Sequence, residues 1–238
     1  RVLTDQISDL LLTPSPDADV NLSREGIPDE RIVRVGNAMI DSLEVHIDAA
    51  RRRRTAHTLG LTENGYVLVT LHRPSNVDHQ PVLTGIIQAL RRLAEELPVV
   101  WPVHPRALAR LEQSDLIESL KRPGMVRLLE PQGYLDFLSL QATARVVLTD
   151  SGGIQEETTA LEVPCLTLRS NTERPITIDQ GTNRLVGTQS SLIVEAARDV
   201  LRAPPSVPRR PELWDGNTAE RVVEALESAN TRAPSTTP

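Results

Sequence analysis

The residues in this chain with the clearest chemical potential are 149–157, which read Thr-Asp-Ser-Gly-Gly-Ile-Gln-Glu-Glu. An apolar run typical of a strand precedes them, and a helical pattern follows. A chain that passes through Ser151, Gly152 and Gly153 into a helix presents free backbone N–H groups at the positive end of the helix dipole. The two glycines let a ligand approach the backbone closely. This segment therefore predicts an anion site suited to a phosphate.

Two acidic residues follow the glycines. We expect Glu156 and Glu157 in the first turn of the helix, where a carboxylate can accept hydrogen bonds from sugar hydroxyls. A ligand that carries both a phosphate and a ribose fits this arrangement.

Polar residues also follow four other apolar runs of the chain. They are His72 and Arg73 after residues 66–71, His104 after 99–103, Gln132 after 126–129, and Arg174 after 164–168. A single histidine after a strand is more often a structural residue. The carboxyl ends of parallel strands meet at one edge of a sheet, however, so the joint arrangement predicts a site there.

Two of these residues have plausible structural alternatives. Arg174 could bind phosphate through its planar guanidinium, or it could pair with Glu173 at the surface. Gln132 and Phe137 could hold a planar base by hydrogen bonding and stacking. Phe137 is the only phenylalanine, and its spacing alone favours a place in the core.

The composition argues against several classes of protein. A net charge of −6 and a pI near 5.5 do not favour a nucleic acid or an anionic membrane as the main partner. Cys165 is the only cysteine, so we expect a small buried side chain, no disulfide and a reducing compartment. No apolar stretch approaches the roughly 20 residues that span a bilayer, and no signal peptide opens the chain. These features predict a soluble, cytoplasmic protein.

The sequence also lacks common cofactor patterns. It has neither the Cys/His spacing of a zinc site nor a Gly-x-Ser-x-Gly elbow. The glycine turn is not Gly-x-Gly-x-x-Gly, so nicotinamide binding is poorly supported. We expect no metal and no cofactor.

The elements that would position these residues alternate along the chain. Short apolar runs predict strands at 10–13, 32–35, 66–71, 99–103, 126–129, 145–149, 164–168 and 184–186. Amphipathic stretches predict helices at 17–25, 39–59, 82–96, 107–120, 134–142, 154–161, 191–201 and 218–228. This alternation indicates right-handed βαβ units and a doubly wound α/β fold, a parallel sheet with helices on both faces.

The same pattern divides the chain into parts. Residues 36–202 are expected to form one Rossmann-like domain, and residues 1–35 contain too few units to close a sheet, so they are expected to end another domain. Residues 203–229 form a proline-rich connection and a last helix, and 230–238 are expected to be a disordered tail. The chain begins inside a structured pattern without a methionine, so we expect a fragment of a longer protein.

Several motifs together resemble the bacterial non-hydrolysing UDP-N-acetylglucosamine 2-epimerases. In the order in which they occur in that family they lie at residues 70–73, 102–105, 131–137, 148–157, 172–175, 181–187 and 215–219. The resemblance extends over residues 1–229, and the combination is far more specific than a Ser-Gly-Gly turn alone.

The resemblance implies the C-terminal half of a two-domain fold like that of the B-type glycosyltransferases. It implies a homodimer that interconverts UDP-N-acetylglucosamine and UDP-N-acetylmannosamine without metal or nicotinamide. In such enzymes UDP leaves C1 as the C2 proton is removed, which gives 2-acetamidoglucal, and UDP then adds back with C2 reprotonated on the other face.

Carried over to this chain, the resemblance assigns Ser151, Gly152 and Gly153 to the diphosphate and Glu157 to the ribose. Arg174 and His72 would lie close to the phosphates, with His72 as a catalytic residue. Gln132 and Phe137 would frame the uracil.

The resemblance also points to a second ligand site. Arg73 and His104 match positions that contact an activating UDP-N-acetylglucosamine in some members. The family often has Glu where this chain has Ser75, and the glutamines of the activator site belong to the first domain. Allosteric activation is therefore not an expectation.

In complete members, a first domain supplies the acidic residues thought to move the C2 proton. We therefore expect this chain to bind UDP weakly and to be inactive alone. The alternatives are a UDP-sugar glycosyltransferase of the same architecture, a hydrolysing relative that releases free N-acetylmannosamine, and a non-catalytic UDP-binding remnant.

Overall fold

The computed structural model describes residues 1–114, 116–120, 126–203 and 210–232. The chain forms two compact units, one of Arg1–Val45 with the described residues from Arg210 on, and one of His46–Arg209. The division falls inside helix α3 (Ala38–Arg53). The domain boundaries expected at 35/36 and 202/203 stay a prediction, and most of the proline-rich connection lies outside the described residues.

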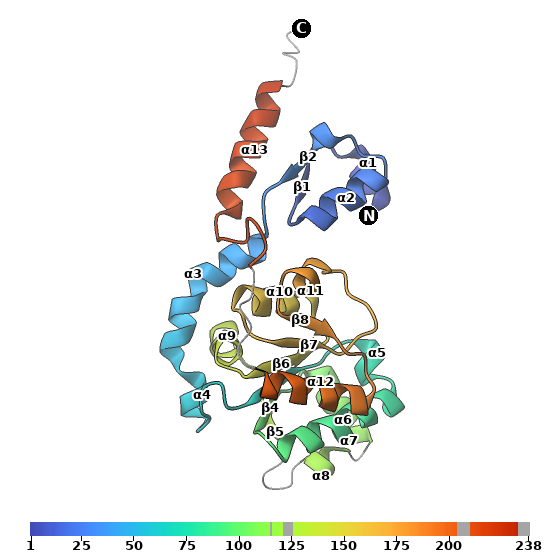
Figure 1. The fold of residues 1–238 in the computed structure, drawn as a ribbon, viewed down its shortest axis with the longest axis vertical. Coiled ribbons are helices and arrows are strands. Elements are labelled where there is room, and N and C mark those ends of the chain that lie inside the picture. Colours follow the sequence, from blue (N-terminus) through green and yellow to red (C-terminus); the bar gives the residue numbers. More distant parts are fainter. Residues whose placement is uncertain (115, 121–125, 204–209, 233–238) are drawn as a thin grey trace. The chain divides into compact units, whose positions relative to one another are not determined.

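The larger unit is built on a six-stranded parallel sheet with the order β5–β4–β3–β6–β7–β8. The strands are β3 (Val67–Thr70), β4 (Val99–Pro102), β5 (Val126–Leu129), β6 (Val146–Thr149), β7 (Cys165–Thr167) and β8 (Asn183–Leu185). The chain moves outward from β3 to β5, returns to place β6 beside β3, and then moves outward again (Figure 1). The predicted doubly wound α/β fold is confirmed.

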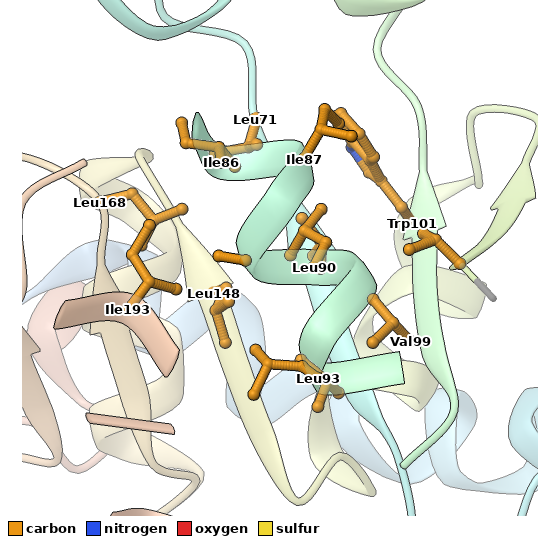
Figure 2. Packing of buried hydrophobic residues seen from close by; sticks show 14 of the residues in the cluster. Leu71, Ile86, Ile87, Leu90, Leu93, Val99, Trp101, Leu148, Leu168 and Ile193 are labelled. Carbon is orange, nitrogen blue, oxygen red and sulfur yellow. The ribbon is translucent and has the colours of Figure 1, made fainter. Parts of the chain in front are cut away.

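Alternating side chains of the strands pack on the two faces of this sheet. On one face, Val67 and Val69 of β3 join a cluster with helices α6 (Gln80–Ala94) and α12 (Ser190–Arg202). Figure 2 shows Leu90 and Leu93 of α6 between the strand residues Val99 and Leu148, with Ile193 of α12 nearby. Burying a side chain of this size contributes about 1.5–3 kcal/mol, so this layer holds α6 and α12 on the sheet.

The opposite face carries a smaller cluster. Leu68 and Val100 point to this side and pack with Leu140 of helix α9 (Tyr134–Ala142) and Ala56 of helix α4 (Thr55–Thr58). Tyr66, which precedes β3, is also fully buried there, and burial raises the pKa of its hydroxyl to about 12. Period-two alternation thus places helices on both faces, as the sequence predicts.

The remaining helices of this unit are α5 (Pro74–Val77), α7 (Pro105–Gln113), α8 (Leu116–Leu120), α10 (Gly152–Ala160) and α11 (Ile176–Asp179). The single helix predicted over 39–59 is wrong, because Arg54 adopts a left-handed conformation (φ 48°) that separates α3 from α4. The helix predicted over 107–120 likewise divides into α7 and α8. Within the described ranges, no helix is both long and apolar enough to cross a membrane.

The smaller unit contains two parallel strands, β1 (Leu11–Thr13) and β2 (Ile32–Arg34). Its helices are α1 (Val2–Ile7), α2 (Pro16–Arg24), the short 3-10 helix η1 (Asp29–Arg31) and α13 (Thr218–Arg232). Helix α13 includes residues 230–232, which were expected in a disordered tail, and residues 233–238 of that tail lie outside the described residues.

A few specific contacts organise this unit. Trp214 is only 1% exposed, and its indole N–H donates to the carbonyl of Pro14 at 2.9 Å. Asp41 of α3 accepts hydrogen bonds from the backbone N–H groups of Thr218 (3.1 Å) and Ala219 (2.7 Å), so it caps the start of α13. A cavity of about 970 Å³ is lined entirely by residues of this unit, from β2, α13 and neighbouring segments.

Candidate functional site at the strand ends

The candidate residues follow strands that all run in the same direction. His72 and Arg73 follow β3, Ser151 follows β6, and these two strands are neighbours in the sheet. The strand order reverses at this pair, which is where ligands bind in open parallel α/β sheets. The structure therefore brings the glycine turn and His72 to the same part of the sheet edge.

Asp150 is the hub of this region. Its carboxylate is fully buried and accepts hydrogen bonds from the backbone N–H groups of His72 (3.1 Å) and Arg73 (3.0 Å) and from Nδ2 of Asn76 (3.1 Å). The same Asn76 amide donates to the carbonyl of Leu168 after β7 at 2.9 Å. Because a buried carboxylate without partners is costly, these donors fix the ends of β3, β6 and β7 against one another.

The ring of His72 also faces Asp150. Its Nδ1 lies 3.1 Å from Oδ1 of the carboxylate, while 43% of the side chain stays exposed. An acceptor at Nδ1 selects the tautomer with the proton there, which leaves Nε2 for a ligand. An imidazolium in this position would donate Nδ1–H to Asp150 and Nε2–H outward, for example to a phosphate oxygen.

His104 lies beside His72, with the two ring centroids 6.0 Å apart. Its Nδ1 accepts a hydrogen bond from the backbone N–H of Arg106 at 3.2 Å, so its side chain caps helix α7. Arg73 points to a different partner, because its guanidinium lies 3.6 Å from the carboxylate of Glu173. The two residues that match activator-site positions of some family members therefore both have structural contacts.

Helix α10 begins at the glycine turn. Ser151 is its N-cap residue, and Gly152 and Gly153 are its first two helical residues, so their N–H groups have no preceding helical carbonyl to bond. A Cβ atom added to Gly152 would meet nothing within 4 Å, so the space beside it is open to a ligand. Glu156 and Glu157 lie in the second turn and not in the first as expected, because the helix starts at Gly152.

Arg174 pairs with a different glutamate from the one the sequence suggests. Its Nε lies 2.7 Å from Oε1 of Glu156 on α10, and its Nη1 donates to the backbone carbonyl of Glu173 at 3.1 Å. The carboxylate of Glu173 instead accepts two hydrogen bonds from Arg169, at 2.8 and 2.9 Å, which hold its pKa at about 2. Arg174 is thus held at α10 with 40% of its side chain exposed.

Glu157 faces helix α9. It is buried, and the hydroxyl of Tyr134 donates to its Oε1 at 3.2 Å. Burial raises the pKa of Glu157, and the charge of Glu156 adds to this shift. Burial and the Glu157 carboxylate raise the pKa of Tyr134 to about 12, while its ring packs edge-on against His46 at 5.7 Å.

The two residues expected to hold the nucleobase, Gln132 and Phe137, lie outside the hydrogen bonds described above. Gln132 donates to the carbonyl of Glu130, two residues away, at 2.8 Å. Phe137 is partly buried against the cluster that contains Leu68 and Val100, so the core alternative describes part of its contacts. Among the described residues, no hydrogen bond joins Gln132 to His72, Ser151 or Arg174.

Sequence reasoning did not identify Asp150 or Asn76 as site residues, and it expected Glu156 at a sugar hydroxyl and not beside Arg174. Only the position of Asp150 between a buried strand and a glycine turn could have pointed to it. In the described part of the chain, no group of three or more His, Cys, Asp or Glu side chains is placed to hold a metal ion.

A parallel sheet whose order reverses at its centre, with a glycine-rich helix start at the reversal, defines this unit as a Rossmann-like α/β domain. The comparisons with known proteins are more specific. Residues 1–227 match the family model described as UDP-N-acetylglucosamine 2-epimerase, and the chain belongs to that family.

Two relatives illustrate the range of the family. The UDP-N-acetylglucosamine 2-epimerase of Methanocaldococcus jannaschii is 37% identical over 231 residues, which are 95% of this chain and 63% of that protein. The UDP-2,3-diacetamido-2,3-dideoxy-D-glucuronate 2-epimerase of Pseudomonas aeruginosa is 38% identical over 231 residues, with 95% of this chain and 62% of that protein covered. The chain therefore spans less than two thirds of the length of either relative.

The fold agrees with this assignment. A crystal structure of the M. jannaschii epimerase in complex with UDP-GlcNAc and UDP superimposes with a TM-score of 0.85 at 37% identity, with 96% of this chain and 63% of that chain covered.

Proposed function

We propose that this chain supplies the nucleotide-binding half of a UDP-sugar 2-epimerase, an isomerase, and that its sugar nucleotide is UDP-N-acetylglucosamine. The observation that carries the proposal is the start of α10, where the space beside Gly152 is open to a ligand. The strand before this helix, β6, lies next to the strand β3 that leads to His72, and Gln155 of α10 bonds to Thr172 in the Arg174 loop. The relatives' activities and the UDP-GlcNAc and UDP in the M. jannaschii structure support it.

In this proposal the diphosphate lies at the start of α10. The N–H groups of Ser151, Gly152 and Gly153 and the helix dipole face it, and Arg174 and His72 supply further donors. Glu157 accepts from the ribose hydroxyls, and Gln132 and Phe137 hold the uracil. The donors around the diphosphate stabilise the negative charge that UDP gains as the C1–O bond breaks, so they assist its departure from the sugar. The ribose and uracil contacts hold the nucleotide equally before and after that step.

The reaction is an elimination followed by an addition. Removal of the proton from C2 of the sugar leaves an electron pair that forms the C1–C2 double bond as the C1–O bond breaks, and UDP leaves with the electrons of that bond. UDP then adds back to C1 while C2 takes a proton on the opposite face. We propose that His72 is the catalytic residue on the UDP side, where it stabilises the leaving phosphate.

The residues that handle the C2 proton are proposed to lie outside this chain, which would make it inactive alone. The homodimer also remains a proposal, whereas activation through Arg73 and His104 is not expected. Sedimentation of the chain with and without UDP-N-acetylglucosamine would test both the oligomeric state and its response to the ligand.

Calorimetric titration with UDP tests the nucleotide site. We expect weak binding to the 238-residue chain, with shifts of the Ser151–Gly153 amide signals in NMR spectra. Arg174→Gln should weaken UDP binding about tenfold, because it removes a charge-assisted hydrogen bond. Arg184→Gln is a matched control, because Arg184 is an exposed arginine of β8 paired with Asp199, and it should bind UDP as the unchanged chain does. Absence of heat and of amide shifts would contradict the proposal.

Proton NMR with two sugar nucleotides tests the reaction and the choice of sugar. We expect the isolated chain to convert neither UDP-N-acetylglucosamine nor UDP-2,3-diacetamido-2,3-dideoxy-glucuronate. A longer protein that contains this chain should epimerise the first. Formation of UDP-N-acetylmannosamine by the isolated chain would refute its inactivity. If the longer protein gave a product only from the second sugar nucleotide, that nucleotide and not UDP-N-acetylglucosamine would be the substrate.

A further inference from the structure

Gln155 occupies an unusual position in helix α10. It lies two residues after the glycine pair, its side chain is fully buried, and it makes three hydrogen bonds. Its Nε2 donates to the carbonyl of Ser151 at 3.0 Å, and its Oε1 accepts from Oγ1 of Thr172 at 2.6 Å and from Nδ2 of Asn183 at 3.2 Å. The amide thus joins the helix start to the loop after β7 and to strand β8.

These bonds lead to both backbone polar groups of Arg174. The N–H of Arg174 donates to Oγ1 of Thr172 at 2.9 Å, and its carbonyl accepts from Oγ1 of Thr177 at 2.7 Å. The hydroxyl of Thr177 in turn accepts from Nδ2 of Asn183 at 3.1 Å. The hydrogen bonds therefore form a closed ring from Arg174 through Thr172, Gln155, Asn183 and Thr177 back to Arg174.

The ring is anchored to the sheet, and its members other than Thr172 and Arg174 are buried. Oγ1 of Thr167 on β7 donates to Oδ1 of Asn183 at 2.6 Å. Thr167, Thr177 and Gln155 are fully buried, and Asn183 is 5% exposed. Buried networks in which every member is bonded favour one arrangement, because any other leaves polar groups unpaired.

We propose that Gln155 is a positioning residue that holds the backbone of Arg174 against the first turn of α10. Resting on the proposed function, this places the Arg174 guanidinium and the N–H groups of Gly152 and Gly153 on one diphosphate. Gln155 does not touch the ligand, and its effect on UDP passes through Arg174.

A purely structural role for Gln155 makes a different prediction. Loss of any buried hydrogen bond would then lower the melting temperature without singling out Arg174. Gln155→Met keeps the length of the side chain and removes all three bonds. Ser139→Ala is a matched control, because buried Ser139 accepts from the N–H of Thr55 at 3.2 Å, a bond outside the ring.

The first readout needs no ligand. The Arg174 amide should exchange with solvent at least about tenfold faster in Gln155→Met than in the unchanged chain, and at an unchanged rate in Ser139→Ala. Thr172→Val breaks the same ring from the loop and should act likewise, which covers the case in which Gln155→Met fails to fold. Thr172→Ser keeps the hydroxyl and should restore slow exchange. Unchanged Arg174 exchange in the folded variants would overturn the positioning role.

The second readout is a double-mutant cycle by UDP titration of folded variants. We expect Gln155→Met and Arg174→Gln each to weaken UDP binding about tenfold, and the double variant to bind no more weakly than Arg174→Gln alone. Uridine, which lacks phosphates, should bind all of them equally. Additive losses would overturn the coupling of Gln155 to Arg174. Failure of the unchanged chain to bind UDP would instead overturn the proposed function, and the exchange rates would then decide the positioning of Arg174 by themselves.

Discussion

The loops at the carboxyl edge of the sheet fall into two halves that are held in different ways. After β3, β6 and β7, hydrogen bonds connect residues far apart in the chain, such as Asn76 with Asp150 and Leu168. After β4 and β5, the candidate residues bond to their own loops, as His104 does to Arg106 and Gln132 to Glu130. In the first half the candidate residues bond across strands, whereas His104 and Gln132 of the second half bond within their own loops. The second half is still attached to the first, because Arg106 pairs with Asp78 and Tyr134 donates to Glu157.

This difference separates two ways of building a binding site. In the first half, donors for an anion are fixed before a ligand arrives, so little ordering cost remains on binding. In the other half, side chains such as Gln132 keep freedom to adjust. A leaving diphosphate benefits most from fixed donors, whereas a planar base tolerates adjustment.

Asp150→Ala should remove the hydrogen bonds that connect the strand ends of the first half, and it should lower the free energy of unfolding more than the other variants. Three buried or partly buried donors, from His72, Arg73 and Asn76, lose their shared acceptor. We expect a loss of about 3 kcal/mol in the free energy of unfolding, measured by urea denaturation. Asp199→Ala is the matched control, because Asp199 is an exposed carboxylate paired with Arg184, and it should cost less than about 1 kcal/mol. Equal losses in the two variants would mean that the strand ends of the first half are not connected in this way.

Glu157→Gln tests the contact between α10 and α9, where the two halves meet. The folded-state pKa of Glu157 is raised above its ordinary value of 4.5, so the unfolded chain ionises first as the pH rises. Glu157 therefore lowers stability progressively from pH 4.5 up to its folded pKa and adds no pH dependence below that window. The stability of the unchanged chain relative to Glu157→Gln should fall across this window in denaturation measured at several pH values. Parallel pH profiles would count against a buried, raised-pKa carboxylate.

Gln132→Ala should have the smallest effect on stability. It tests the loops after β4 and β5, where the candidate residues bond within their own loops. Its one side-chain hydrogen bond is local, so the free energy of unfolding should change by no more than about 0.5 kcal/mol. Under the proposed function, UDP binding should still weaken, because the side chain meets the uracil. A large loss of stability would show that Gln132 is held by more than its own loop.

The architecture followed from the sequence because strands and long helices have strong local signals. Apolar runs bounded by polar residues located β1 to β8 to within one or two residues. The short helices α1, α5 and α11 have too few residues to show a period. The break at Arg54 was missed because a left-handed residue other than glycine has no local signature.

The site could be predicted only in part. Residue type and position after a strand pointed to His72, Ser151, Gly152, Gly153 and Arg174, which the topology places on one edge. Pairings between distant residues were not predictable. Arg174 meets Glu156 across a helix turn and a loop, and Asp150 takes its donors from residues more than 70 positions earlier. Such partners depend on tertiary packing, which a single sequence does not encode locally.

The chain contains two tryptophans, and each compact unit holds one of them in its interior, Trp101 in β4 and Trp214 beside Pro14. The fluorescence of one buried tryptophan therefore reports on each unit. In the variants Trp101→Phe and Trp214→Phe, tryptophan fluorescence would come from one unit only. The temperature at which that fluorescence shifts to longer wavelength in each variant would show whether the two units unfold together or in sequence.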